Sequence, residues 1–356
     1  MPDDLAPPQP TDVAALARRL ADLRAAEPAL RAREAAARLG ISEGELVALG
    51  CGTAATVRLA PRFTAIVARL PELGEVMALT RNESCVHEKV GRYDKLSLEG
   101  HIGLVLDPDI DLRIFFGHWA MGFALREDTK DGIRRSLQFF DKDGTAVHKV
   151  YLRAGSDIAA FDRLVADFTA DGQGPEQPVF AVAPKPAERP DAAIDVGGFA
   201  AAWRALEDTH EFFALLRRFD VRREQALRLI GDEFCRPLDR AAIRPLLETA
   251  SGEALPIMIF VGSAGVIQIH TGPVANIVEM GPWINVMDPG FNLHLRLDRI
   301  ASSYVVKKPT RDGTVTSVEL FDAEGDLIAM LFGKRKPGEI ELDAWRHLVD
   351  GLPGRA

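Results

Sequence analysis

The sequence predicts an α+β fold that contains two copies of one module, each with helices followed by a large antiparallel sheet. Residues 81–153 and 262–334 align without a gap at a constant offset of 181, and many of the identical residues are glycines, aspartates and core residues. A helical segment repeats as well, because residues 33–39 match residues 223–229 at an offset of 190. Such self-similarity indicates an internal duplication. Polar residues that only one copy possesses are therefore the first candidates for function.

The first copy is predicted to begin with helices, over residues 11–50. Apolar residues recur with helical spacing through Val13–Ala25. Ser42 is followed three residues later by Glu45, which is the pattern of a capping box at a helix start.

From about Val76 the pattern changes to short runs separated by turn residues, as in an antiparallel sheet. Along 109–116 the side chains alternate, so that Ile110, Leu112, Ile114 and Phe116 share one face of the strand. The pairs Asp131-Gly132 and Asp143-Gly144 are typical of hairpin turns.

Five prolines within residues 173–197 indicate a linker or surface connection between the copies. We therefore predict a first repeat at 1–172, the Pro-rich linker at 173–197, and a second repeat at 198–356.

The second repeat is predicted to follow the same order. Helices are expected at Phe199–Leu216 and Arg222–Glu233, and a sheet from about Pro256 to Lys334. A closing helix near Leu342–Leu348 has its counterpart in the first copy at Ile158–Phe168.

Composition excludes several classes of protein. The chain has 356 residues, is 47% hydrophobic and carries a formal charge of −9, which argues against a nucleic-acid partner bound through a broad basic surface. Its three cysteines lie far apart, and no Cys-x-x-Cys-His motif for covalent haem attachment is present. The N-terminus lacks the pattern of a signal peptide, and the most apolar stretch, Leu255–Val261, is too short to span a bilayer. A cytoplasmic protein is the expectation.

The two copies differ at a few polar positions. His210 occupies the position of Leu20, Arg113 that of His294, and Lys308 that of Glu127. His210 is expected in the first turn of a helix capped by Asp208 or Thr209, where the helix dipole favours a neutral, metal-binding imidazole.

Together, one histidine, nearby aromatic residues and scattered cations suggest haem, a flat iron-bearing ligand with two carboxylates. Each residue also has a simpler reading. A histidine at a helix start is commonly a surface or capping residue, Arg113 can be a strand residue paired with Asp111, and the lysines can be solvated surface charges.

Longer segments resemble the HemS-type hemin-degrading factors, the cytoplasmic haem-binding proteins of bacterial haem uptake. The likeness runs in order through residues 12–352 and includes the duplication. It is carried by Thr80–Lys89, Glu99–Leu106, Ile110–Phe115, Asp208–Phe213, Gln268–Gly272, Lys308–Gly313 and Leu331–Arg335.

This resemblance implies two similar halves with non-covalent haem b in a cleft between them. The family's proximal iron ligand falls on His210, and its distal arginine falls on Arg113, beside Phe115. The remaining implied haem contacts are Arg223, Lys308 and Arg335 for the propionates, and Phe213 and Phe260 for the apolar face. Some members carry a tyrosine at Phe332, so stacking is retained there but a hydroxyl is missing.

The resemblance implies haem binding and trafficking, with haem received from an inner-membrane importer and passed to an acceptor such as a haem oxygenase. An alternative is an oxygenase-type enzyme that opens the porphyrin and releases iron, for which Arg113 would be catalytic. A non-haem interaction scaffold is a third hypothesis. His270 and His294 remain alternative iron ligands.

Overall fold

The structure, a computed structural model, describes residues 12–181, 185–336 and 338–355. Its strands form two nine-stranded sheets. The first has the order β1 (Thr56–Arg58), β7 (Met121–Thr129), β8 (Gly132–Phe140), β9 (Ala146–Ser156), β2 (Gly74–Arg81), β3 (Cys85–Gly91), β15 (Phe291–Arg296), β14 (Trp283–Asp288) and β13 (Ile277–Met280). The second has the order β10 (Cys235–Pro237), β16 (Ser302–Thr310), β17 (Gly313–Phe321), β18 (Leu327–Gly333), β11 (Ile257–Gly262), β12 (Val266–Gly272), β6 (Asp111–Phe115), β5 (Ile102–Leu106) and β4 (Leu96–Glu99).

The helices of the first copy are α1 (Val13–Ala26), α2 (Ala32–Leu39), α3 (Glu43–Ala48), α4 (Phe63–Ala68) and α5 (Ile158–Phe168). Those of the second are α6 (Val196–Arg204), α7 (Glu211–Phe219), α8 (Arg223–Leu229), α9 (Ile243–Gly252) and α10 (Asp343–Asp350). Three helices of the first copy, α2, α4 and α5, have counterparts in the second copy, α8, α9 and α10. Short 3-10 turns lie at Leu70–Leu73, Phe116–His118, Asp191–Ala193, Arg240–Ala242 and Leu297–Arg299. The predicted α+β class is confirmed.

The duplication is visible in local geometry as well as in element order. Both copies have a β-bulge at the same place, between Phe139 and Phe140 and, 181 residues later, between Leu320 and Phe321. Equivalent hairpins also have the same closing hydrogen bond. The hydroxyl of Thr129 donates to the Gly132 carbonyl at 2.7 Å, and the hydroxyl of Thr310 donates to the Gly313 carbonyl at 2.6 Å. The predicted internal repeat is therefore present in the backbone itself.

The chain divides into two compact units that do not coincide with its two sequence copies. Among the described residues, unit 1 holds 12–81, 88–181 and 263–268, and unit 2 holds 82–87, 185–262, 269–336 and 338–355. Segment 263–268 is firmly held in unit 1, since the Gly265 carbonyl accepts from the Phe115 amide at 2.9 Å and from the Trp119 indole at 3.2 Å. The predicted repeat limits, 1–172 and 198–356, stay predictions.

The predicted linker 173–197 is only partly described, because residues 182–184 lie outside the described residues. Its first part is hydrogen-bonded to unit 1, where the Gln173 amide accepts from the Arg58 backbone amide and donates to the Arg58 carbonyl, both at 2.9 Å. Its later part belongs to unit 2, where Lys185 pairs with Asp326. Helix α6 begins at Val196, inside the predicted linker.

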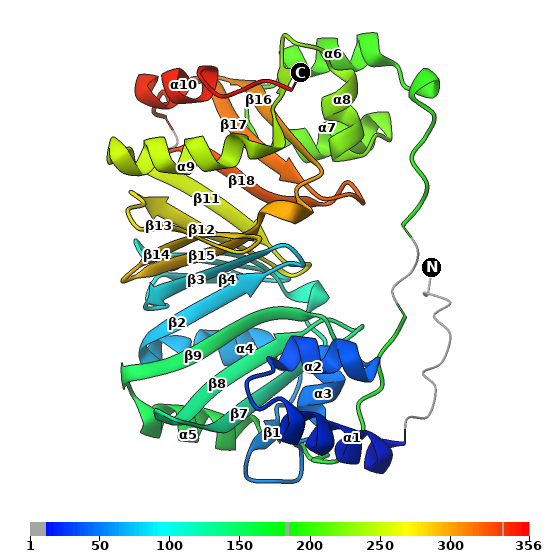
Figure 1. Ribbon diagram of the computed structural model, residues 1–356, viewed down its shortest axis with the longest axis vertical. Coiled ribbons are helices and arrows are strands. Elements are labelled where there is room, and N and C mark those ends of the chain that lie inside the picture. Colours follow the sequence, from blue (N-terminus) through cyan, green and yellow to red (C-terminus); the bar gives the residue numbers. More distant parts are fainter. Residues whose placement is uncertain (1–11, 182–184, 337, 356) are drawn as a thin grey trace. The chain divides into compact units, whose positions relative to one another are not determined.

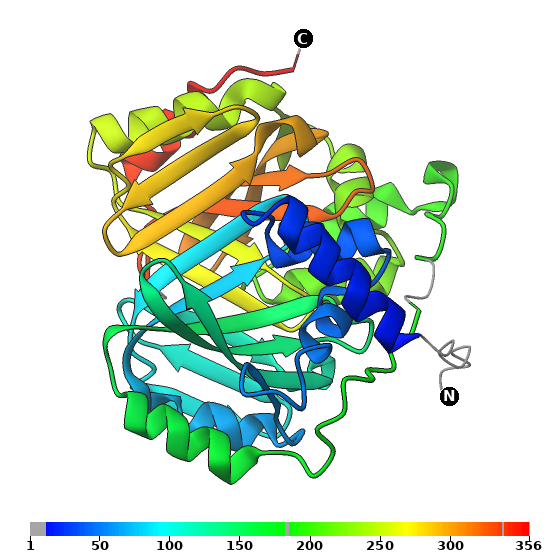
Figure 2. The same ribbon diagram turned by 60° about the horizontal axis from the view of Figure 1, so that its bottom comes forward.

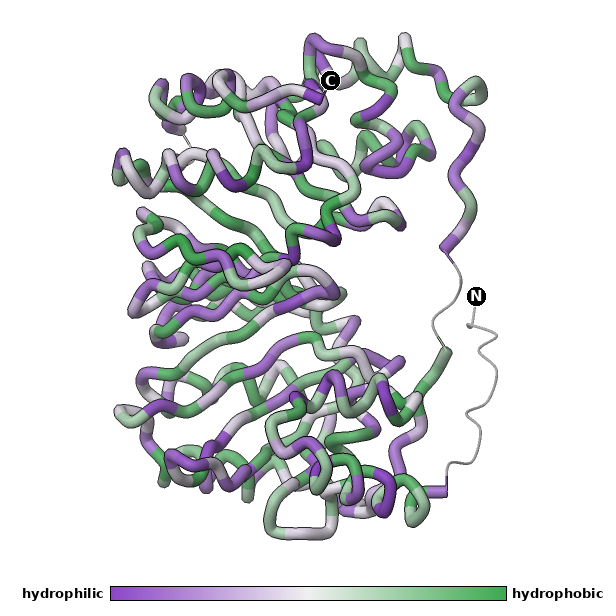
Figure 3. The backbone as a smooth tube through the Cα atoms, in the orientation of Figure 1, coloured by the Kyte–Doolittle hydropathy of each residue, from purple (hydrophilic) through white to green (hydrophobic). Residues whose placement is uncertain are grey.

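In unit 2 one face of the strands β16, β17, β18 and β11 is covered by α9 and α10, and part of the other face is covered by α6, α7 and α8 (Figure 1). One face packs Ile259, Leu320 and Leu331 against α9 and α10. Part of the other face packs Tyr304 and Val306 against α6, α7 and α8. The backbone tube shows hydrophobic and hydrophilic residues alternating along the helices, as expected when each helix buries one face (Figure 3).

Helices α4 and α5 lie along one face of the unit 1 strands (Figure 2). The strand at 109–116 shows the predicted alternation, with Ile110, Leu112 and Ile114 fully buried. The predicted capping box is also present, because Ser42 and Glu45 bond to each other's backbone amide at 3.2 and 2.8 Å.

The helices predicted around Phe199–Leu216 are present as two elements, because α6 ends at Arg204 and α7 begins at Glu211. His210 is expected in the first turn of the second helix, but it directly precedes α7. The polar side chain of Asp208 bonds to the backbone within this break, as short acidic side chains commonly do in turns. In the described chain, no helix is both long and apolar enough to cross a membrane.

Unit 2 packs tightly where Gly333 meets Trp345. A Cβ added at Gly333 would lie 2.6 Å from Trp345 Cγ, and Trp345 is fully buried. We expect Gly333→Ala to lower the free energy of unfolding by about 1–3 kcal/mol, because overpacking forces neighbouring groups apart. Urea unfolding measures this change. Gly290→Ala, where an added Cβ meets nothing within 4 Å, is the control and should change stability by less than about 0.5 kcal/mol.

Unit 1 contains a buried neutral histidine, His148, whose ring nitrogens lie 2.9 Å from Thr80 Oγ1 and 2.7 Å from Tyr93 Oη. Burial lowers the pKa of His148 to about 3. The unfolded chain therefore binds one more proton than the folded chain between about pH 6.5 and pH 3, and folded stability is lost as pH falls through this window.

We expect His148 to contribute a loss of about 1.4 kcal/mol per pH unit below roughly pH 6. Urea unfolding at several pH values measures this slope. His148→Gln should reduce it, and an identical slope in the variant would assign the acid sensitivity to other groups.

Candidate functional site

His210 lies in the break between α6 and α7, directly before the first residue of α7. Its side chain is 91% exposed. The backbone amide of His210 donates to Asp208 Oδ1 at 2.8 Å, and ring Nδ1 lies 2.6 Å from the same oxygen. A carboxylate can only accept, so Nδ1 carries the hydrogen of this bond. In the neutral ring the lone pair is then on Nε2, which is the tautomer that a metal ligand at Nε2 needs.

Asp208 is the residue that fixes this turn. Its carboxylate accepts from the amide two residues later, which is an Asx turn. The backbone and ring hydrogen bonds of His210 hold the pKa of Asp208 below its ordinary value, and the positive charge of Arg335 contributes. Asp208 thus acts near the helix start as predicted, although His210 itself precedes the helix.

Three charged residues of unit 2 form a cluster near Phe212 of α7. Arg223, the first residue of α8, donates through Nε and Nη2 to the two oxygens of Glu319 at 2.7 and 2.8 Å. Lys308 donates to Glu319 Oε1 at 2.8 Å, and its ammonium lies 4.5 Å from the centre of the Phe212 ring. Lys308 and Glu319 are both buried, and Arg223 is largely so. The structure therefore brings the predicted residues Arg223 and Lys308 together.

Burial alone would raise the pKa of the Glu319 carboxyl, but the charges and hydrogen bonds of Arg223 and Lys308 outweigh it and hold the pKa far below its usual range. Burial lowers the pKa of Lys308, and Glu319 partly offsets that effect. Two cations on one carboxylate leave a cluster with one surplus positive charge.

A half-buried apolar surface continues from this cluster along the same face of the sheet. It consists of Met258, Phe260, Met330 and Phe332, which we call the apolar sheet surface. The rings of Phe260 and Phe332 pack at a centroid distance of 5.0 Å. Met330 joins the surface to the charged cluster, because its sulfur lies 3.1 Å from Arg223 Nη2.

Phe213 on α7 is 54% exposed, and the Arg223 guanidinium lies 5.6 Å from the centre of its ring. Arg335 follows β18 and is close enough to lower the pKa of Asp208. Unit 2 therefore carries every predicted contact residue except Arg113 and Phe115.

Arg113 and Phe115 belong to unit 1, where they share one face of β6. Arg113 forms an ion pair with Asp111 and donates to the Leu112 carbonyl at 3.2 Å. Burial raises the pKa of Asp111, while Arg113 opposes the shift. The pair with Asp111 that was expected for a simple strand residue is therefore present, and the distal role of Arg113 stays a prediction. The structure does not bring Arg113 to His210 within one unit.

The alternative histidines are less accessible than His210. His270 is 4% exposed and its ring stacks on Phe291 at 3.8 Å with an interplanar angle of 8°. His294 is half-buried, and its Nδ1 lies 2.7 Å from Asn285 Oδ1.

Glu319 is the residue that sequence reasoning missed. The signal was present in the duplication, since the equivalent residue of the first copy is the neutral Gln138. Comparison of the aligned copies for lost or gained charge would have found it.

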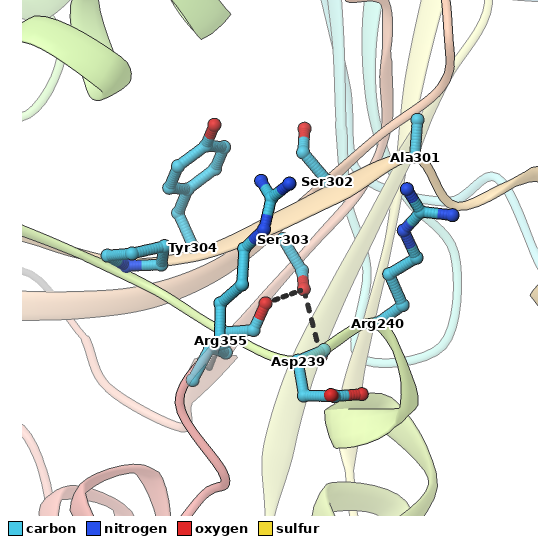
Figure 4. Close-up of a pocket in the computed structure, with 9 residues that line it drawn as sticks. Asp239, Arg240, Ala301, Ser302, Ser303, Tyr304 and Arg355 are labelled. Atoms are coloured by element: carbon cyan, nitrogen blue, oxygen red, sulfur yellow. Dashed lines mark hydrogen bonds between the residues drawn. The ribbon is translucent and has the colours of Figure 1, made fainter.

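A small cavity of about 180 Å³ in unit 2 does not belong to this group of residues (Figure 4). Ser303 donates across it to the carbonyls of Leu238 and Asp239 at 3.4 and 3.2 Å. It is smaller than the pockets that hold drug-sized ligands. Among the described residues, no group of three or more His, Cys, Asp or Glu side chains could hold a metal ion.

Comparison with known proteins identifies relatives along nearly the whole chain. The family model for the haemin-degrading HemS/ChuX domain matches residues 40–168 and 220–352. The hemin transport protein HmuS of Yersinia pestis is 41% identical over 341 residues, which cover 95% of this chain and 97% of that protein. Crystal structures show the same fold. Holo-PhuS, a heme-binding protein from Pseudomonas aeruginosa, has a TM-score of 0.94, 48% identity, and coverage of 97% and 100% of the two chains. The heme degrading enzyme ChuS of Escherichia coli O157:H7 has a TM-score of 0.89, 38% identity, and coverage of 96% and 99%.

Proposed function

Because the chain belongs to the haemin-degrading HemS/ChuX family, we propose that it binds one haem non-covalently in the cytoplasm and passes it on during haem iron acquisition. The observation that carries this proposal is the exposed imidazole of His210, whose Nδ1 is held by Asp208, which leaves Nε2 available as a ligand atom. Metal-binding histidines characteristically donate their other ring hydrogen to a carboxylate or carbonyl.

His210 is the proposed axial ligand of the haem iron. The carboxylate of Asp208 orients the ring and increases the electron density at Nε2, which strengthens a bond to iron. The high exposure of the imidazole is consistent with a haem that must bind and be released.

The neighbouring residues of unit 2 fit the rest of a haem. Phe213 and the apolar sheet surface can cover the macrocycle, and Arg223 and Arg335 can bind its propionates, with the positive charge of the buried Lys308 beside Arg223. Phe332 offers an aromatic face but no hydroxyl. The distal role of Arg113 beside Phe115, and a cleft that joins both halves, stay predictions from the family resemblance.

Hemin titration of the purified chain, followed by absorbance, tests this proposal. We expect a saturable Soret band at one haem per chain. No band at all would remove the haem proposal and favour a non-haem interaction scaffold.

Haem degradation is the second candidate function, because one relative is described as a heme degrading enzyme and another as a hemin transport protein. The same residues would serve both roles, with Arg113 donating to groups at the open face of the iron. A defined linear tetrapyrrole and released iron in the presence of catalase would establish turnover. Loss of colour that catalase abolishes would instead come from free peroxide.

Delivery is the third point to test, since the proposed role requires an importer as donor and an acceptor such as a haem oxygenase. Haem-loaded chain mixed with an oxygenase should transfer its haem, which is seen as a change in the Soret band. Retention of the haem by the chain, together with intrinsic turnover, would favour the enzyme.

A further inference from the structure

Glu319 has no assigned role, yet it is the centre of the charged cluster in unit 2. Each of its oxygens accepts from Arg223, and one of them also accepts from Lys308 and from Ser317 at 3.1 Å. Its side chain is fully buried, so it cannot itself contact a ligand on the surface. Through these hydrogen bonds it can fix the positions of the Arg223 and Lys308 side chains.

The first copy shows that the fold does not need a carboxylate at this position. The equivalent residue, Gln138, is also buried, and its side-chain amide donates to Ser136 at 3.1 Å. Ser136 and Ser317 are themselves equivalent. The first copy has Glu127 where the second has Lys308, so the carboxylate and the lysine appear together in the second copy only.

We propose that Glu319 is a positioning residue: it holds the partly exposed Arg223 guanidinium in place to bind a haem propionate, and it keeps the buried ammonium of Lys308 beside that guanidinium as a second positive charge. This inference rests on the proposed haem binding. A buried lysine and a nearby arginine repel each other, and the shared carboxylate between them removes that repulsion. The cluster keeps one surplus positive charge, which a propionate can neutralise.

Glu319 also keeps Lys308 charged. The groups facing Lys308 are Glu319 on β17, Arg223 on α8, Cys235 on β10 and the Phe212 ring on α7. Of these, Arg223 disfavours the ammonium and Glu319 favours it. Removing the carboxylate leaves a buried lysine beside an arginine, and such a lysine loses its proton at a lower pH.

The test compares hemin with hemin dimethyl ester, which lacks ionised propionates, on the wild-type chain and on Glu319→Gln. At about pH 9 the variant should bind hemin roughly 10- to 100-fold more weakly than wild type, as expected for the loss of a charge-assisted hydrogen bond. At about pH 6 the deficit should shrink to a few-fold, because Lys308 regains its proton. Ester affinity should change less than about two-fold at either pH.

Glu341→Gln is the matched control, since Glu341 is another buried carboxylate of unit 2 and bonds to Thr316 and Arg346. It should leave the ratio of hemin to ester affinity unchanged at both pH values. If Glu319→Gln does not fold, Glu319→Asp serves instead. Its shorter side chain keeps the charge but cannot reach both cations, so hemin affinity should fall without a pH dependence.

The inference would be overturned if the ratio of hemin affinity to ester affinity in Glu319→Gln equalled that of wild type at both pH values. Equal losses of affinity for hemin and for its ester in this variant would also overturn it. Absence of hemin binding by the wild-type chain would overturn the proposed function instead, so the two failures are distinguishable.

Discussion

Replacing His210 with alanine is expected to abolish or strongly shift the Soret band of the hemin complex and to weaken hemin binding by more than about 100-fold. Loss of a partner that only orients a ligand already costs 10- to 100-fold in metal affinity, and loss of the ligand itself should cost more. The helix α7 should form normally, because His210 precedes its first residue and its side chain makes no capping hydrogen bond. Absorbance titration and circular dichroism measure the two effects.

His294→Ala and His270→Ala are the controls, since both histidines lie on strands of the second copy. Their spectra should match wild type. A band that survives in His210→Ala but disappears in His294→Ala would move the iron ligand to the strand and remove the residue assignments made here for unit 2.

Replacing Asp208 with alanine should weaken hemin binding by about 10- to 100-fold, which is typical for the carboxylate partner of a metal-binding histidine. The substitution removes the acceptor of both the ring and the backbone of His210. Asp208→Asn should recover part of the loss, because an amide oxygen still accepts the Nδ1 hydrogen but carries no charge. Hemin titration measures the affinity, and the Soret position reports the ligand field.

Asp298→Ala is the matched control, an exposed aspartate of unit 2 that pairs with Arg296. It should leave hemin affinity unchanged. Equal affinities of Asp208→Ala and wild type would show that the turn geometry, rather than Asp208, orients the imidazole.

The fold could be predicted because its strongest signals are local and repeated. The offset of 181, the capping box at Ser42 and the alternation over 109–116 each follow from side-chain pattern, and all three are present in the structure. The helix start near Asp208 was predicted, but its exact place was not, because His210 directly precedes α7 and Asp208 bonds to the backbone of the turn.

The candidate site could be predicted only in part. Arg223 on α8 and Lys308 on β16 were proposed as separate contacts, yet they share one carboxylate that comes from a third element, strand β17. Such a meeting depends on strand register, which places Glu319 opposite both Tyr304 and Met330. Register is a tertiary property, and a single sequence shows it only through comparison of its two copies.

The segment 263–268 sets a condition on synthesis of the chain. Unit 1 includes these residues, which emerge from the ribosome long after the rest of that unit. Domains commonly fold from the N-terminus as they are made. Unit 1 cannot reach its final form that way, because the backbone partner of Phe115 and Trp119 is Gly265. During translation, the N-terminal part of unit 1 therefore lacks the hydrogen-bond acceptor of Phe115 and Trp119 until residues 263–268 have been synthesised.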